Sequence, residues 1–259
     1  MTQGEIQEFA YLVDLIAKLR GPEGCPWDKE QTHGSLRESL LEESYEELDA
    51  LDDSNGKKLR EELGDLLLQI VMHAQIASEA GEFDIKDVIN DISTKLIRRH
   101  PHVFEDTLVS SAQEVSRNWE KIKKTERHPE TSILASVPKQ MPALAYSQKI
   151  QSRVAQIGFD WENLDGVIDK LVEEVKEYTE TENQAEREDE FGDLLFTLVN
   201  VARRVAVEPE VALRQANRKF LNRFSTMEKI CYERGLELGK LSFGQQNRLW
   251  EEAKKITGP

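Results

Sequence analysis

The sequence predicts an all-α protein built from two tandem helical repeats. Apolar residues recur at three- and four-residue steps through most of the chain, which is typical of amphipathic helices. Gly and Pro are sparse, with 14 and 8 in 259 residues, and β-branched alternation is rare. Two acidic segments, 40–77 and 171–204, carry charged and apolar residues in the same order. Self-similarity of this kind indicates an internal repeat.

Helical periodicity places five helices in each half of the chain. In the first half we expect them at residues 6–19, 36–51, 59–80, 85–99 and 112–124. Ser35 is expected to cap the second of these, with Glu38 as its capping-box partner. In the second half we expect helices at residues 143–157, 167–181, 186–207, 210–234 and 245–256.

The segment 128–142 differs from its surroundings. It contains three prolines and has no helical period, which predicts a linker. We therefore expect a first domain at residues 1–127 and a second domain at residues 143–259.

Charge and hydropathy exclude several classes of protein. The formal net charge of −15 argues against binding to nucleic acid, which depends on basic patches. No stretch of about 18 apolar residues is present, so a membrane span is not expected. The start of the chain is polar and acidic rather than signal-like. Cys25 and Cys231 form neither a CxxC motif nor a disulfide framework. These features favour a soluble, cytoplasmic protein.

Each repeat carries two pairs of carboxylates at helical spacing. Residues three apart share one face of a helix, so two antiparallel helices can bring four carboxylates to one point. Such a group repels itself strongly without a counter-ion, and a hard divalent cation such as Mg²⁺ is its natural partner. The pairs are Glu43/Glu46 with Glu62/Asp65 in the first repeat, and Glu174/Glu177 with Glu190/Asp193 in the second.

Basic and aromatic residues are repeated as well. Lys95 and Arg99 correspond to Lys219 and Arg223, and the pattern Trp-x-x-x-Lys occurs as Trp119/Lys123 and as Trp250/Lys254. The basic side chains suit phosphate, and a tryptophan can stack on a nucleobase. Together with the acids they predict a metal-dependent site for a nucleoside polyphosphate, in which metal-held water attacks phosphorus.

At this point the sequence resembles a known family. EESYE (42–46) with EELGD (61–65), and EEVKE (173–177) with DEFGD (189–193), resemble the ExxE…ExxD signature of MazG-type nucleoside triphosphate pyrophosphohydrolases. The segments GCPWDKEQTHGSL and KLIRRHPHVF are also similar to that family. The two-repeat layout resembles its long bacterial members.

The resemblance implies MazG-like modules of the four-helix-bundle type, completed by formation of a homodimer. It also implies Mg²⁺-dependent hydrolysis, with Mn²⁺ as a substitute metal. The substrates would be nucleoside triphosphates, including ATP and deoxynucleotides, cleaved between the α and β phosphates to the monophosphate and pyrophosphate. Broad base specificity is expected.

Roles for individual residues follow from the same resemblance. The eight acids above would be Mg²⁺ ligands, and Glu173 and Glu42, one residue before the first ligand of each repeat, are candidates to activate the attacking water. Lys219, Arg223 and Lys254 would hold phosphate, and Trp250 would contact the base. Their first-repeat counterparts are Lys95, Arg99, Lys123 and Trp119.

Some alternatives stay open. We favour the second repeat as the active one, because Arg99 precedes His100-Pro101 and the residue before a proline disfavours helix. The first repeat is then a second active site or an assembly domain. Trp27 and Trp161 are interpreted as structural. Two non-enzymatic alternatives are an acidic helical adaptor whose repeats serve dimerisation, and acid clusters that bind metal only for structure.

Overall fold

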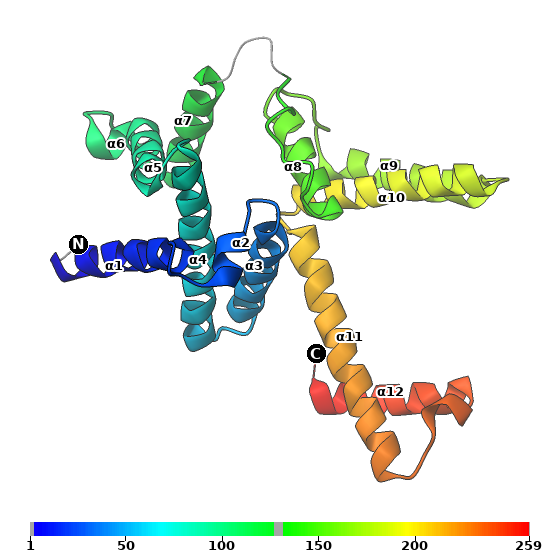
Figure 1. The fold of residues 1–259 in the computed structure, drawn as a ribbon. Coiled ribbons are helices and arrows are strands. Elements are labelled where there is room, and N and C mark those ends of the chain that lie inside the picture. The colour runs from blue at the N-terminus through cyan, green and yellow to red at the C-terminus, as the bar shows by residue number, and fades with distance from the viewer. Residues whose placement is uncertain (1–2, 127–131, 259) are drawn as a thin grey trace. The chain divides into compact units, whose positions relative to one another are not determined.

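The computed structural model describes residues 3–126 and 132–258, and within these ranges the secondary structure is helical with no strand. The all-α prediction is confirmed. The chain divides into two compact units, Met1–Arg127 and His128–Pro259 (Figure 1). The first four residues of the expected linker, 128–131, lie outside the described residues. The rest of that segment forms turns before the next helix and contains the buried Val137.

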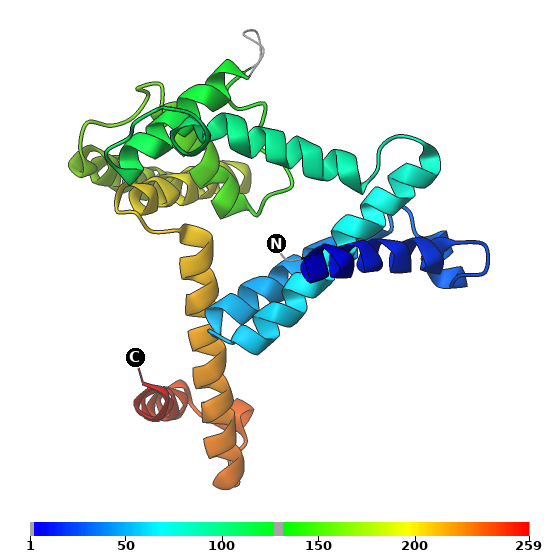
Figure 2. The ribbon, with the colours of Figure 1, turned by 90° about the vertical axis from the view of Figure 1, so that its left-hand side faces the viewer.

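The first unit is organised around a helical hairpin. Its helices are α1 (Gln3–Arg20), α2 (Pro26–Glu30), α3 (Leu36–Asp52), α4 (Gly56–Ala80), α5 (Ile85–Arg99), α6 (Pro101–Phe104) and α7 (Ala112–Thr125). A short turn joins α3 to α4, and the two helices run side by side (Figure 2). Ile16, Leu36, Val71 and Met72 form a core that holds α1 and α3 against α4. The α3–α4 hairpin carries the first acid set.

Helix boundaries in this unit follow local capping chemistry. α4 begins three residues before its apolar pattern does, because the side chain of Asn55 accepts a hydrogen bond from the Lys58 backbone N–H at 3.1 Å. The expected capping role of Ser35 is wrong. Ser35 has helical backbone angles, and its hydroxyl donates to the Gln31 side chain at 2.7 Å instead of receiving a backbone N–H of α3.

The second unit contains two hairpins. Its helices are α8 (Ala143–Ala155), α9 (Leu164–Glu180), α10 (Gln184–Arg204), α11 (Pro209–Glu233) and α12 (Phe243–Thr257), with a 3₁₀ turn, η1 (Leu238–Lys240). α9 pairs with α10, and α11 pairs with α12 (Figure 1). The α11–α12 hairpin closes over a core made by Met227, Ile230, Cys231, Leu249 and Ala253.

The loop between α8 and α9 is attached to α10 by an ion pair. Arg203 donates a hydrogen bond from Nη1 to Oδ2 of Asp160 at 3.0 Å, and Arg204 donates to the same oxygen at 3.2 Å. The hydrogen bond from Arg203 lowers the pKa of Asp160. Across the described part of the chain, every helix is too short or too polar to cross a bilayer.

Candidate metal centre

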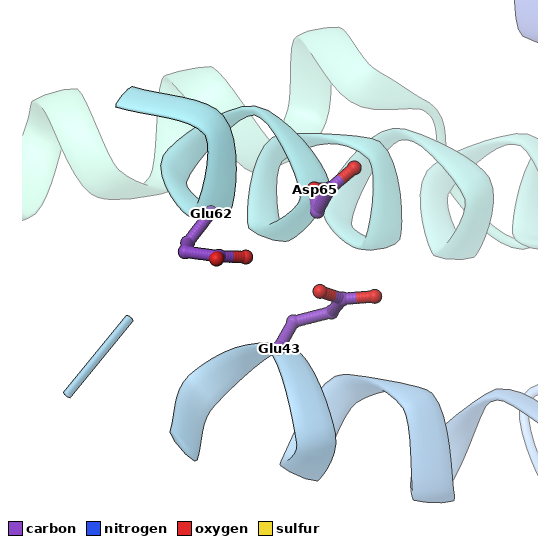
Figure 3. Close-up of side chains that lie close together, drawn as sticks. All are labelled: Glu43, Glu62 and Asp65. Atoms are coloured by element: carbon purple, nitrogen blue, oxygen red, sulfur yellow. The ribbon is translucent and has the colours of Figure 1, made fainter. Parts of the chain in front are cut away.

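The first repeat brings three carboxylates together between α3 and α4. Glu43 extends from α3 toward Glu62 and Asp65 on α4 (Figure 3). One oxygen atom of each lies within 4.8 Å of the others. Glu62 is the most deeply placed of the three, at 5% exposed. The cluster is held on two rigid helices, so its geometry depends on the register of the hairpin.

The second repeat forms an equivalent cluster between α9 and α10. Glu174 and Glu177 come from α9 and Glu190 from α10, again with one oxygen of each within 4.8 Å of the others. Here the buried member is Glu174, at 4% exposed. The side chain of Asn183 accepts from the Glu186 backbone N–H at 3.0 Å, which starts α10 directly after the short turn. That turn sets Glu190 opposite the acids of α9.

Each cluster contains three of the four acids that the sequence singles out. Glu46 and Asp193 lie outside these groups, and both are exposed. They remain electrostatic neighbours of the clusters. Glu46 raises the pKa of Glu62, after the larger effect of burial, and Asp193 contributes in the same way at Glu190.

Burial and mutual repulsion raise the pKa of carboxylates in both clusters. Burial raises the pKa of Glu43 above its ordinary value of 4.5, and repulsion by Asp65 and Glu46 raises it further. At Glu190, burial is again the first cause of a raised pKa, followed by repulsion from Glu177. An all-oxygen donor set with excess negative charge is the kind of site that Mg²⁺ or Mn²⁺ occupies.

A lysine lies one helical turn before the buried acid of each cluster. Lys170 places Nζ 2.8 Å from Oε1 of Glu174 and 2.7 Å from Oε1 of Glu173, the candidate for water activation. In the first repeat Lys58 Nζ lies 4.0 Å from Oε1 of Glu62. Glu173 and Glu42 are both exposed.

The phosphate- and base-binding candidates of the second repeat lie on the α11–α12 hairpin. Lys219 lines a cavity of about 460 Å³, which also involves Asn222 and Gly258. Arg223 donates from Nη2 to the Gly258 carbonyl at 3.0 Å, and its buried Nε has no hydrogen-bond partner among the described residues. Trp250 packs on Phe220 with ring centroids 5.2 Å apart. Lys254 forms an ion pair with Glu251 at 2.9 Å.

Their first-repeat counterparts are arranged differently. Arg99, the last residue of α5, lies over the ring of Trp119 and donates hydrogen bonds to Glu126. Lys95 is exposed, and Lys123 is half-buried on α7. The guanidinium of Arg99 therefore already has an anionic partner within its own unit.

One feature of the second unit was missed by sequence reasoning. A largely apolar cavity of about 230 Å³ lies between α8, α10 and the loop that follows α8, with Phe159, Trp161 and Phe196 in its wall. Gln151 also lines it, and its buried Oε1 has no hydrogen-bond partner within the described chain. Trp161, which was interpreted as structural, thus borders this cavity. The two aromatic residues of GFDW (158–161), close together in a short loop, were the available signal.

The fold and the clusters define an all-α protein with a carboxylate centre of the divalent-metal type in each repeat. The family described as "MazG nucleotide pyrophosphohydrolase domain" matches residues 31–104, which include the first acid set. The chain is 47% identical to the nucleoside triphosphate pyrophosphohydrolase/pyrophosphatase MazG of Thermotoga maritima, over 95% of both chains. It is 45% identical to the nucleoside triphosphate pyrophosphohydrolase of Escherichia coli, over 94% of this chain and 96% of that one. This chain belongs to the MazG family.

A solved structure of a mazG-related protein from Thermotoga maritima matches 44% of this chain and 98% of its own, at 28% identity and a TM-score of 0.39.

Proposed function

We propose that this chain, a hydrolase of the MazG family, cleaves nucleoside triphosphates and deoxynucleoside triphosphates between the α and β phosphates. The products are the nucleoside monophosphate and pyrophosphate. The reaction depends on Mg²⁺, which Mn²⁺ can replace, and it accepts many bases. The observation that carries the proposal is the convergence of Glu174, Glu177 and Glu190 on one point between α9 and α10.

The acids of the second repeat fit a hard divalent cation. Their oxygens are close together, Glu174 is buried, and burial and repulsion raise the pKa of Glu190. Glu174, Glu177 and Glu190, with Asp193 as a further ligand, would hold Mg²⁺, which would supply positive charge for phosphate oxygens and make a bound water more acidic. Glu43, Glu46, Glu62 and Asp65 are the corresponding ligands in the first repeat.

The remaining residues act on water and on the nucleotide. Glu173 accepts the proton of the attacking water, with Glu42 as its first-repeat counterpart. Lys219, Arg223 and Lys254 bind phosphate oxygens, and Trp250 contacts the base. Lys95, Arg99, Lys123 and Trp119 occupy the corresponding positions in the first repeat. Tolerance for different bases is expected where stacking rather than base-edge hydrogen bonding holds the base.

The second repeat is the favoured catalyst. Arg99 is already paired with Glu126 and stacked on Trp119. Arg223, by contrast, keeps a buried Nε without a partner in the described chain and lies beside the cavity that Lys219 lines. A phosphate in that cavity would meet Lys219, and Arg223 reaches the cavity wall through its hydrogen bond to the Gly258 carbonyl.

Formation of a homodimer is part of the proposal. Large apolar side chains on the α9–α10 hairpin are exposed, among them Val172 at 64% and Phe191 at 47%. The α3–α4 hairpin likewise exposes Leu41 and Leu63. Apolar stripes on a helical hairpin are what a second hairpin covers when it completes a four-helix bundle.

The activity is tested by separating products from mixtures of ribo- and deoxynucleotides, with Mg²⁺, with Mn²⁺ and with chelator. The expected result is monophosphate and pyrophosphate in equal amounts, and only with metal. Release of the nucleoside diphosphate and inorganic phosphate would contradict the proposed cleavage position. Turnover that persists in chelator would contradict the metal requirement.

A further inference from the structure

The acid cluster of the second repeat includes a cation of its own. The ammonium group of Lys170 is 2.8 Å from Oε1 of Glu174, which is 4% exposed, and 2.7 Å from Oε1 of Glu173. It therefore joins the buried metal-ligand candidate to the candidate water activator.

From this geometry we propose that Lys170 is the exchangeable counter-ion of the second metal centre. It neutralises Glu174 and restrains Glu173 while the site is empty, and it leaves both carboxylates when the divalent cation binds. Lys170 is thus a positioning residue that regulates metal entry. The inference rests on the proposed function, because it takes Glu174 as a metal ligand.

Simple electrostatics favours the exchange. A carboxylate oxygen bound to a divalent cation has less negative charge to offer a lysine, and two cations so close repel each other. The Lys170 side chain is 34% exposed, so a path to solvent is open to it once Glu174 is taken. The free energy of metal binding at this site therefore includes the cost of breaking the contact between Lys170 and Glu174.

The two repeats differ at this point. By the offset that relates Glu174 to Glu43, Lys170 corresponds to Ser39, which has no charge. The lysine of the first repeat, Lys58, instead precedes Glu62 and stands 4.0 Å from it, a looser contact than that of Lys170. The second centre is consequently the one in which a protein cation competes most directly with metal.

The test is a calorimetric titration of the nucleotide-free full chain with MgCl₂, in a Glu43→Gln/Glu62→Gln background that disables the first centre. Lys170→Gln is expected to bind Mg²⁺ about tenfold more tightly, because it removes both the competing bond and a nearby positive charge. Lys170→Arg keeps the charge and is expected to bind within about twofold of the parent. Lys176→Gln is the matched control on the same helix, since Lys176 pairs with Glu180 at 3.8 Å, and no change is expected there.

A second readout uses the metal-free proteins. Without Mg²⁺, Lys170→Gln is expected to melt at a lower temperature than the parent, because Glu174 loses its partner, and saturating Mg²⁺ should abolish that difference. Lys170→Ser, which copies the first repeat, serves if the glutamine variant does not fold. The reciprocal change Ser39→Lys, in a Glu174→Gln/Glu190→Gln background, is expected to weaken Mg²⁺ binding at the first centre.

The outcomes separate the two proposals. If the parent binds Mg²⁺ and Lys170→Gln binds it with the same affinity, the role of Lys170 is wrong while the metal centre stands. If the parent binds no Mg²⁺ or Mn²⁺, the metal centre is wrong and the counter-ion role is wrong with it. An equal gain of Mg²⁺ affinity in Lys176→Gln would show that removing any nearby positive charge has this effect. That result would also overturn the role of Lys170.

Discussion

The guanidinium carbon of Arg99 lies 5.3 Å from the ring centroid of Trp119, so a phosphate-binding candidate of the first repeat rests on the base-binding candidate of the same repeat. The second repeat replaces this contact with a different one, in which Phe220 packs on Trp250. The guanidinium of Arg223 turns to the Gly258 carbonyl. The two repeats thus share a sequence pattern but use it for different contacts.

This difference predicts that the second repeat carries turnover. Glu177→Gln is expected to lower kcat by about 100-fold or more, because a bound metal supplies several kcal/mol of charge stabilisation and about 1.4 kcal/mol is tenfold in rate. Glu46→Gln, the matched first-repeat variant, is expected to change kcat by less than about threefold. Steady-state pyrophosphate release measures both. Loss of turnover only in Glu46→Gln would show that the first repeat is the catalyst.

The Arg99–Trp119 contact itself is expected to be structural. Arg99→Ala should lower the free energy of unfolding by about 1–2 kcal/mol, through loss of the cation–π contact and the partly buried ion pair with Glu126. Arg98→Ala is the matched control. It touches the same Glu126 at 2.7 Å, but its side chain is 54% exposed, so its loss should cost about 0.5 kcal/mol or less. Urea unfolding measures both, and equal effects would contradict the structural role.

Phosphate binding is expected to depend on Lys219. Lys219→Ala removes a charge from the wall of the cavity beside Gly258 and should raise KM for a nucleoside triphosphate by about tenfold, with a smaller change in kcat. Lys229→Ala, an exposed lysine further along α11, is the control and should leave both constants unchanged. A fall in kcat at constant KM in Lys219→Ala would show that this residue stabilises the transition state rather than the bound substrate.

The base is expected to lie against Trp250 rather than in the cavity at Trp161. Loss of a stacked aromatic side chain costs about 1–3 kcal/mol per base, so Trp250→Ala should raise KM by roughly 5- to 100-fold. Trp161→Ala should leave KM within about twofold. Melting temperatures of both variants control for the packing of Trp250 on Phe220. The reverse pattern of KM values would move the base to the apolar cavity between α8 and α10.

Metal binding should strengthen as pH rises above 4.5. The folded chain raises the pKa of Glu43, Glu62 and Glu190 above that ordinary value, each chiefly through burial. Protonated, these groups stabilise the metal-free fold at low pH, and this contribution is lost as the pH rises through the raised pKa values. Mg²⁺ competes with the same protons. The increase in melting temperature caused by Mg²⁺ should therefore be smallest near pH 4.5 and grow through this window.

The control for this pH dependence is Glu190→Gln, which removes one of the titrating groups. Its Mg²⁺-induced increase in melting temperature should be smaller than that of the parent and should change less with pH. An increment in the parent that stays constant from pH 4.5 upward would mean that these carboxyls do not bind the metal.

The sequence by itself determined the long helices and the identity of the acids, whereas the short helices α2 and α6 and the 3₁₀ turn η1 were not expected. Helix α4 and helix α10 could be predicted because their apolar residues recur with the helical period, and three-residue spacing placed Glu62 with Asp65 and Glu174 with Glu177 on one face. Because the same acid pattern occurs in both halves of the chain, it pointed to a specific site rather than to ordinary surface charge. These features depend on residues close together in the chain, so the spacing of residue types is enough to predict them.

Tertiary structure decided which atoms meet. The register of the α3–α4 and α9–α10 hairpins selected three acids in each cluster and left Glu46 and Asp193 outside. Burial chose different members, Glu62 in one repeat and Glu174 in the other, so the i,i+4 contact of Lys170 reaches a buried acid. The capping role expected of Ser35 is wrong for a similar reason, because its hydroxyl donates a hydrogen bond to the Gln31 side chain in the preceding loop. Such outcomes depend on desolvation and on competing partners brought in by folding, which spacing along the chain does not specify.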